Sequence, residues 1–253
     1  MSTVIKTKDL CKTYIVDKQS NNVLQNVNLN VDEGEFVTVM GPSGSGKSTL
    51  LYTVSGMDSV TAGSVLFDGE ELTSMKEKEL INIRLLKMGF IFQQMYMMKK
   101  LSIIDNIILP AYQAKLKPRD EVRKDAENLM RKLEIIETSD REITEVSGGQ
   151  LQRACLCRAL INSPKVLFAD EPTGALNSKA SRDVMQRLLE ANRAGTTVLM
   201  VTHSERVASV SDRIIYLVDG GVQGELVLGK MTGDEQIASR ERKVRSWLDQ
   251  MGW

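Results

Sequence analysis

The stretch EFVTVMGPSGSGKSTLL, residues 35–51, decides the fold. Its first six residues are almost all apolar, which is typical of a parallel strand covered on both faces by helices. The next nine, GPSGSGKST at 41–49, satisfy the spacing G-x-x-x-x-G-K-[ST]. This motif is informative only where it joins a strand to a helix, and both flanks fit here. The stretch therefore predicts a phosphate-binding loop and disfavours a chance turn rich in glycine and serine.

Each residue type in this loop has a physical role. Gly44 and Gly46 let the backbone approach phosphate oxygens, and a helix that starts near Lys47 adds its positive dipole end. Lys47 is expected to reach the β- and γ-phosphates of a nucleotide, and the Ser48 hydroxyl to coordinate Mg²⁺. The candidate binding residues of the loop are Gly41, Ser43, Gly44, Ser45, Gly46, Lys47, Ser48 and Thr49.

Outward from the loop, short runs typical of strands alternate with longer helical segments, which indicates an α/β fold with a mainly parallel sheet. The runs are at 3–9, 27–31, 35–40, 64–67, 89–92, 165–169, 196–202 and 213–218, followed by a strand at 222–228 after a hairpin turn. Residues 94–163 show helical spacing instead. We expect one domain, 1–253, with an ATP-binding core at 1–93 and 164–228, a helical subdomain at 94–163 and a helical tail at 229–253.

Composition excludes several classes of protein. The 33 basic residues balance the 33 acidic ones, so bulk binding of nucleic acid has no electrostatic basis. The longest apolar runs fall far short of the ~20 residues that a membrane helix needs, and the N-terminus lacks the apolar core of a signal peptide. We therefore expect a cytosolic protein. Its cysteines, Cys11, Cys155 and Cys157, fit packing in a reducing compartment, and no metal site built from His and Cys is expected.

A second motif, KVLFADEP at 165–172, is an apolar strand that ends in two carboxylates. Side chains alternate along a strand, so Asp170 and Glu171 can serve different roles. Asp170 suits a Mg²⁺ ion and Glu171 suits a general base for an attacking water. Alone, such a pair would more often form a turn and a helix cap. The phosphate loop in the same chain favours the catalytic interpretation.

The third motif, VSGGQ at 146–150, precedes an amphipathic helix and by itself is a capped helix after a flexible turn. With a phosphate loop before it and ADEP at a strand end after it, the chain resembles the nucleotide-binding subunits of ABC transporters over about residues 3–228. The resemblance implies a P-loop ATPase of the ABC type, with an N-terminal antiparallel part, an inserted helical subdomain and MgATP as ligand. It also implies that Ser147, Gly148, Gly149 and Gln150 cover the γ-phosphate bound to a second subunit, in a head-to-tail dimer.

Further residues take roles from this resemblance. Tyr14 matches the aromatic residue that stacks on adenine, although a simple strand-end tyrosine is the alternative. Gln93 matches the glutamine that contacts Mg²⁺ and the lytic water; Gln94 fits less well. His203 matches the histidine that contacts the γ-phosphate and orients the base. One position departs from the family pattern, because GALN at 174–177 has Asn177 where aspartate is usual, which removes a charge.

ADEPTGAL at 169–176 resembles the branch of macrolide exporters, lipoprotein-releasing transporters, cell-division ATPases and bacitracin-type resistance transporters. This implies a permease partner with a large extracytoplasmic domain and a position on the inner face of the cell membrane. Two alternatives stay open: a soluble ABC ATPase of the iron–sulfur scaffold type, and a regulator of cell division or of a cell-wall hydrolase.

Two apolar segments have open interpretations. QMYMMKKL at 94–101 suits either core packing or an adaptable groove, formed by Met95, Tyr96, Met97 and Met98, for a cytoplasmic helix of the permease. In the tail, Val244, Trp247, Leu248 and Met251 share one helical face. That face is expected to pack on its own domain; a dimer or permease contact is the alternative.

Overall fold

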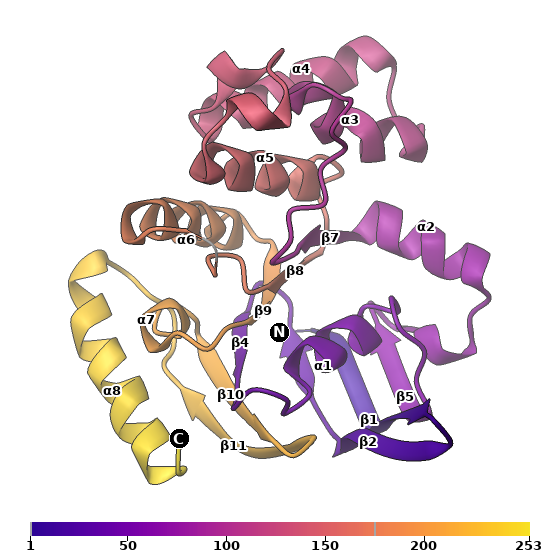
Figure 1. The fold of residues 1–253 in the computed structure, drawn as a ribbon, viewed down its shortest axis with the longest axis vertical. Coiled ribbons are helices and arrows are strands. Elements are labelled where there is room, and N and C mark those ends of the chain that lie inside the picture. Colours follow the sequence, from indigo (N-terminus) through magenta and orange to yellow (C-terminus); the bar gives the residue numbers. More distant parts are fainter. Residues whose placement is uncertain (1, 175) are drawn as a thin grey trace. The chain divides into compact units, whose positions relative to one another are not determined.

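The computed structural model describes residues 2–174 and 176–253 and divides into two compact units. The first unit comprises Met1–Leu80 and Thr197–Trp253, and the second comprises Ile81–Thr196 (Figure 1). Together they have the mixed α/β architecture that the sequence predicts. The boundaries predicted for the core, the helical subdomain and the tail remain a prediction.

The first unit contains an antiparallel sheet in the order β2-β1-β5-β6, with β3 paired to β1. Its strands are β1 (Thr3–Val16), β2 (Gln19–Val27), β3 (Asn30–Asp32), β5 (Ala62–Phe67) and β6 (Glu70–Glu71). The sheet explains one wrong prediction, because the expected strand at 27–31 is two strands separated by Asn28 and Leu29. Most of the hairpin formed by β1 and β2 was also missed, since its polar, exposed residues do not resemble a buried strand.

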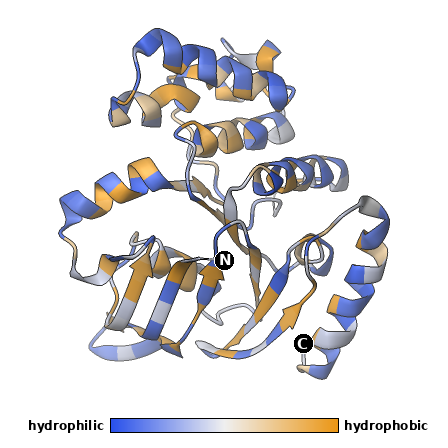
Figure 2. Cartoon of the chain, turned by 180° about the vertical axis from the view of Figure 1, so that it is seen from behind, coloured by the Kyte–Doolittle hydropathy of each residue, from blue (hydrophilic) through white to orange (hydrophobic). Residues whose placement is uncertain are grey.

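The same unit contains four neighbouring strands in the order β11-β10-β4-β9. They are β4 (Phe36–Met40), β9 (Thr197–Val201), β10 (Arg213–Val218) and β11 (Gly221–Val227). β4 is parallel to both β9 and β10, and every residue of β4 and β9 is buried. This confirms that their apolar runs mark interior parallel strands. In Figure 2 these strands are coloured mainly as hydrophobic.

Short helices follow the strands of the first unit. They are α1 (Lys47–Val54), the 3-10 turns η1 (Leu72–Ser74) and η4 (Asp234–Gln236), α7 (Glu205–Ala208) and the terminal α8 (Ile237–Gln250). Val244 and Leu248 of α8 are fully buried in a cluster with Tyr216, and Trp247 and Met251 pack against it. The predicted apolar face of the tail therefore packs on its own unit.

The second unit contains the parallel pair β7 (Met88–Ile91) and β8 (Val166–Asp170) and a group of helices. α2 (Glu77–Lys87) leads into it, and its other helices are α3 (Ile103–Ala114), α4 (Arg119–Lys132), η2 (Ile136–Thr138), η3 (Ile143–Glu145), α5 (Gly148–Leu160) and α6 (Ser178–Arg193). α3 contacts both α4 and α5. Cys155 and Cys157 are buried in α5, as expected of packing residues.

Candidate nucleotide-binding and hydrolysis residues

The predicted phosphate loop connects the end of β4 to the start of α1. Gly44 and Gly46 both have positive φ, 82° and 97°, which only glycine adopts without strain. A Cβ atom at Gly46 would lie 2.7 Å from the Val23 carbonyl oxygen, and one at Gly41 would lie 2.0 Å from that of Leu217. Glycine is therefore required at Gly46 by both conformation and space, at Gly44 by conformation and at Gly41 by space.

The side chain of Lys47 bonds back to the start of this loop. Its ammonium donates hydrogen bonds to the carbonyl oxygens of Gly41, at 2.9 Å, and Pro42, at 2.8 Å. Ser45 is 3% exposed, and its Oγ is one of three buried side-chain polar atoms without a hydrogen-bond partner among the described residues. A half-buried lysine ammonium and a buried, unsatisfied hydroxyl beside it suit an anionic, oxygen-rich ligand.

The turn between β10 and β11 lies directly against this loop. Gly220 donates from its backbone N–H to the Ser45 carbonyl oxygen at 3.2 Å, and its own carbonyl oxygen accepts from Gln25 N–H at 2.9 Å. A Cβ atom at Gly220 would lie 2.4 Å from the Val23 carbonyl oxygen. The hairpin turn thus supports both β2 and the phosphate loop through backbone contacts.

Tyr14 lies on β1 in the same unit and is 37% exposed. Its hydroxyl donates to Asp58 Oδ2 at 2.5 Å, while Lys12 Nζ is 2.6 Å from Asp58 Oδ1 and 4.7 Å from the Tyr14 ring centroid. Burial and the hydrogen bond to Asp58 raise the pKa of Tyr14. Sequence analysis missed Lys12 and Asp58. The spacing of Lys12 and Tyr14, two residues apart on one strand face, was the available signal.

His203 lies in the turn between β9 and α7 and is exposed. The residues on either side hold this turn. Ser204 donates from its backbone N–H to Thr202 Oγ1 at 3.2 Å, and its own side chain caps α7 by accepting from Val207 N–H at 3.4 Å. The phosphate loop, Tyr14 and His203 therefore all belong to the first unit.

In the second unit, the two predicted carboxylates occupy different environments. Asp170 is the last residue of β8 and is 5% exposed. Glu171 follows with φ +46°, a left-handed conformation that is uncommon for a residue with a side chain. Neither caps a helix, because α6 begins later and has Asn177 as its N-cap. The helix cap of the turn-and-cap interpretation is therefore supplied by Asn177, and the left-handed backbone at Glu171 is the kind of strain that clusters at functional positions.

Gln93 lies close to this acidic pair. A Cβ atom placed on Gly174 would be 3.7 Å both from Gln93 Nε2 and from Glu171 Cβ. Gly174 also donates from its backbone N–H to the Glu171 carbonyl oxygen at 3.1 Å. The structure therefore brings Gln93 and Glu171 near the same glycine. Glu171 is the predicted general base, and the family resemblance implies that Gln93 contacts the lytic water.

The SGGQ segment caps α5 in the way its sequence predicts. Ser147 Oγ accepts from Gln150 N–H at 3.3 Å, and Gln150 Oε1 accepts from Ser147 N–H at 2.9 Å. This reciprocal pair leaves the N–H groups of Gly148 and Gly149 as the first in the helix, where no intrahelical acceptor exists. A Cβ on Gly149 would approach Ala180 Cβ to 3.1 Å, so α5 and α6 begin in contact.

Asn177 provides the N-cap of α6. Its Oδ1 accepts from Lys179 N–H at 3.1 Å and from Ala180 N–H at 2.9 Å. The amide oxygen thus supplies the capping bonds that an aspartate would supply, without its charge. Ala175, in the same GALN segment, lies outside the described residues.

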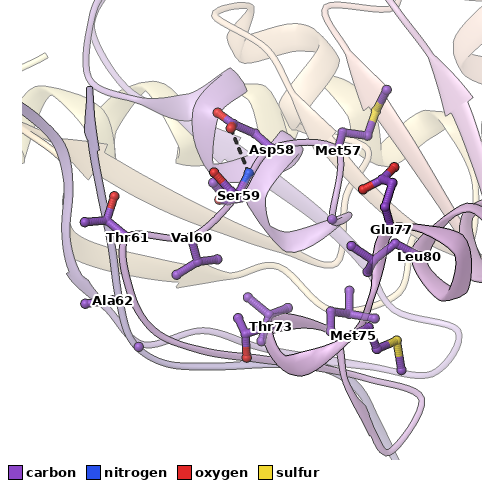
Figure 3. Close-up of a pocket in the computed structure, with 15 residues that line it drawn as sticks. Met57, Asp58, Ser59, Val60, Thr61, Ala62, Thr73, Met75, Glu77 and Leu80 are labelled. Atoms are coloured by element: carbon purple, nitrogen blue, oxygen red, sulfur yellow. Dashed lines mark hydrogen bonds between the residues drawn. The ribbon is translucent and has the colours of Figure 1, made fainter. Parts of the chain in front are cut away.

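A pocket of about 340 Å³ lies elsewhere in the first unit (Figure 3). The loop that follows α1 forms one side, with Met57, Asp58 and Val60, and Leu72 and Leu80 add apolar surface. No residue of the phosphate loop lines it, so this pocket is separate from the candidate phosphate site.

Two features define the class of protein, which is a P-loop ATPase. One is a glycine-rich loop with a lysine, directly after a buried parallel strand, and the other is an acidic pair at the end of another strand. Comparison with known proteins narrows this class. The chain belongs to the ABC transporter family, because the sequence model of that family matches residues 24–174.

Relatives of known name are ATP-binding proteins of transporters of this family. The chain is 39% identical over 227 residues to the bacitracin export ATP-binding protein BceA of Halalkalibacterium halodurans, covering 89% of each chain. It is 38% identical to the lipoprotein-releasing system ATP-binding protein LolD of Aquifex aeolicus, covering 89% of this chain and 99% of LolD. It is 39% identical to the macrolide export protein MacB of Chlorobaculum tepidum, of which it covers 33%.

A solved structure extends the likeness to the fold. The ATP-binding cassette MJ0796, in a dimeric post-hydrolysis state with ADP and Pi, superimposes with a TM-score of 0.84 at 40% identity, over 90% of this chain and all of that one. The chain is therefore an ATP-binding, ATP-hydrolysing subunit of the ABC transporter type. Within residues 2–174 and 176–253, no helix is long and apolar enough to span a bilayer.

Proposed function

We propose that the protein binds MgATP between two copies arranged head to tail and drives a membrane permease on the inner face of the membrane. The observation that carries this proposal is the phosphate loop, in which Lys47 is held inside a glycine cradle. The dimeric MJ0796 structures and the export function named for BceA support it. The proposed role of the ATPase cycle is export, protection against antimicrobial peptides, or transmission of force to an extracytoplasmic domain.

The residues divide into three proposed roles. Lys47 and the loop amides bind the β- and γ-phosphates, Tyr14 stacks on adenine, and the SGGQ segment covers the phosphates held by the other copy. Mg²⁺, when bound, would neutralise charge on the phosphates. Its proposed ligands, Ser48, Asp170 and Gln93, all offer oxygen donors, which this hard cation prefers. Glu171 accepts the proton of the attacking water, and His203 contacts the γ-phosphate and orients Glu171.

The left-handed backbone at Glu171 supports its assignment as the base. Its φ of +46° turns its side chain out of the regular alternation of β8 just after Asp170. Two neighbouring carboxylates can then act separately, one toward a cation and one toward a water. Gln93 Nε2 and Glu171 Cβ each lie 3.7 Å from the position of a Cβ on Gly174, which supports a role for Gln93 at the same water.

The segment Met95–Met98 is the proposed docking surface for the permease. Its backbone is fixed at both ends: Arg158 donates to the carbonyl oxygens of Met95 and Tyr96, at 2.8 and 2.7 Å, and Asn106 Oδ1 accepts from Met98 N–H at 2.7 Å. The side chains of Tyr96 and Met98 are nevertheless 65% and 54% exposed. A hydrogen-bonded backbone that presents exposed apolar side chains suits a partner helix and disfavours simple core packing.

The test begins with Glu171→Gln, which retains binding but removes the base. With MgATP this variant should form a stable dimer in size-exclusion chromatography with light scattering, and its ATPase activity should fall at least 100-fold, the range expected for loss of a general base. Glu121→Gln, an exposed acid in the first turn of α4, is the matched control and should behave as wild type.

The wild-type protein should show ATPase activity per subunit that rises with protein concentration. A monomer that hydrolyses ATP with constant specific activity would contradict the dimer. Capture of the trapped variant from solubilised native membranes then tests the partner. Co-purification of a permease supports the transporter assignment, and a soluble partner would favour the scaffold or regulator alternative.

A further inference from the structure

Three side chains from two distant segments of the first unit form one connected cluster around Tyr14. Asp58 uses both carboxylate oxygens, because Oδ2 accepts the Tyr14 hydroxyl at 2.5 Å and Oδ1 accepts the Lys12 ammonium at 2.6 Å. The same ammonium lies 4.7 Å from the centroid of the Tyr14 ring. The ring is therefore held at its hydroxyl and against one face, which leaves a single orientation.

Lys12 is fixed as firmly as the ring it contacts. It is 5% exposed, although lysine is almost never buried unless paired. Its ammonium also donates to the Ser59 carbonyl oxygen at 2.6 Å and to Ser59 Oγ at 3.3 Å. The hydrogen bonds that the Lys12 ammonium donates thus all go to Asp58 and Ser59, in the loop after α1. Because this cation lies on one face of Tyr14, a planar base can stack only on the other face.

Asp58 is in turn fixed by the helix of the phosphate loop. The N–H groups of Met57 and Asp58 donate to the Tyr52 carbonyl oxygen in α1, at 2.9 and 3.1 Å. Asp58 Oδ1 also accepts from Ser59 N–H at 2.7 Å, the bond drawn in Figure 3. The helix α1 therefore begins at the phosphate-binding loop and ends at the loop that holds the tyrosine hydroxyl.

We propose that Lys12 and Asp58 are positioning residues, which orient Tyr14 for stacking on the base and so set the affinity of this chain for adenine nucleotides. The inference rests on the proposed role of Tyr14. It adds that the stacking surface is built by an ion pair between β1 and the loop after α1, and that α1 sets the spacing between the base and triphosphate ends of the nucleotide.

The test compares binding of MgATP with binding of magnesium tripolyphosphate, which has no base, by calorimetry on the full chain. Base stacking on an aromatic side chain is worth about 1–3 kcal/mol, so Tyr14→Ala should weaken ATP binding by roughly 5- to 150-fold. Asp58→Ala, Lys12→Met and Tyr14→Phe should each weaken it less than Tyr14→Ala does, by about 3- to 10-fold, because the ring is still present to stack. Tripolyphosphate binding should not change, and KM for ATP should rise at constant kcat.

Two further variants separate positioning from a general structural effect. In the Tyr14→Ala background, Asp58→Ala should cause no additional loss, because the ring through which it acts is absent. Thr13→Val is the matched control. Thr13 lies on β1 between Lys12 and Tyr14, and the change removes only the bond from its Oγ1 to Asn22 Oδ1 on β2, so both affinities should stay unchanged. Lys12→Arg should restore most of the affinity that Lys12→Met loses.

The possible failures differ. If Tyr14→Ala leaves ATP affinity unchanged, the proposed role of Tyr14 is wrong and this inference falls with it. If Tyr14→Ala weakens binding but Tyr14→Phe, Asp58→Ala and Lys12→Met do not, only the positioning role is wrong. Equal loss of ATP and tripolyphosphate binding in Asp58→Ala would show that the loop acts on the phosphate site, and would also overturn it.

Discussion

At the scale of single residues, Asp58 shows how two neighbours control one carboxylate. Its partial burial alone would raise its pKa, but the hydrogen bonds donated by Lys12 and Tyr14 outweigh burial and leave the pKa of Asp58 below its ordinary value. A carboxylate whose pKa is lower in the folded state stabilises that state above its unfolded pKa, and the stabilisation disappears as pH falls through the folded pKa.

This gives a pH dependence that can be measured. The unfolded pKa of an aspartate is about 3.9, so the stabilisation from Asp58 should be complete at pH 6 and should decline below about pH 4. The free energy of unfolding of Asp58→Asn, from urea titrations, should therefore lie below that of wild type at pH 6, and the gap should narrow toward pH 3. Asp140→Asn, an aspartate 88% exposed, is the control and should show no such gap. A gap that widens in acid would contradict the assignment.

How well the sequence predicts residues depends on how far apart their partners are. The phosphate loop and the SGGQ cap were predicted because their geometry is built within a few consecutive residues. Lys12 and Asp58, 46 positions apart, could not be paired from spacing. The left-handed backbone of Glu171 was equally out of reach, because nothing in an Asp-Glu pair specifies φ.

At the scale of elements, α8 is attached by a buried arginine as well as by its apolar face. Arg240 is 8% exposed, and it donates to the carbonyl oxygens of Ser209, Ser211 and Gly229 at 2.7, 2.6 and 3.0 Å. Two of these carbonyls lie between α7 and β10, and the third lies just after β11. One guanidinium thus satisfies several buried acceptors and joins the tail to the rest of its unit.

Replacing this arginine should destabilise the protein. Arg240→Met keeps much of the side chain's volume but leaves buried carbonyls unsatisfied, so the free energy of unfolding should fall by about 2–4 kcal/mol. Arg242→Met, on the same helix, removes an exposed arginine with one 3.3 Å contact to Ala238 O, and should change it by less than about 0.5 kcal/mol. Chemical denaturation measures both. Equal effects would mean that the carbonyls find other partners.

The elements predicted well are those with a strong hydrophobic period. β4, β8 and β9 were found to within about a residue because both of their faces are buried, and the apolar face of α8 followed from its spacing. The hairpin of β1 and β2 was missed because it turns at Asp17 and Lys18, both with positive φ, without the glycine that usually marks such a turn.

At the scale of the whole molecule, the segment Met95–Met98 is the proposed link to a partner. Tyr96 and Met98 of this segment are mostly exposed, and the Tyr96 ring contacts only the edge of the Phe92 ring among aromatic side chains, so a charge placed there should affect assembly more than folding. Tyr96 is the most suitable position because it is 65% exposed, while its own carbonyl oxygen is held by Arg158.

Tyr96→Asp should therefore reduce permease association at least tenfold in co-purification from membranes, with the thermal unfolding temperature nearly unchanged. Leu116→Asp makes the same kind of change at a side chain 68% exposed on another part of the second unit, and should assemble normally. Unaltered assembly of Tyr96→Asp would contradict the docking surface. Loss in both variants would indicate a general effect of added charge.

The turn between β10 and β11 has a consequence for protein engineering. A two-residue hairpin end is usually a tolerant place for a tag, an inserted peptide or new chain termini. Here the backbone of Gly220 bonds to Ser45 and Gln25 and packs against Val23, so added residues would push directly on the phosphate-binding loop. The tip of the β1–β2 hairpin, where Asp17 and Lys18 are exposed, is the better place for a fluorescent label or a split site.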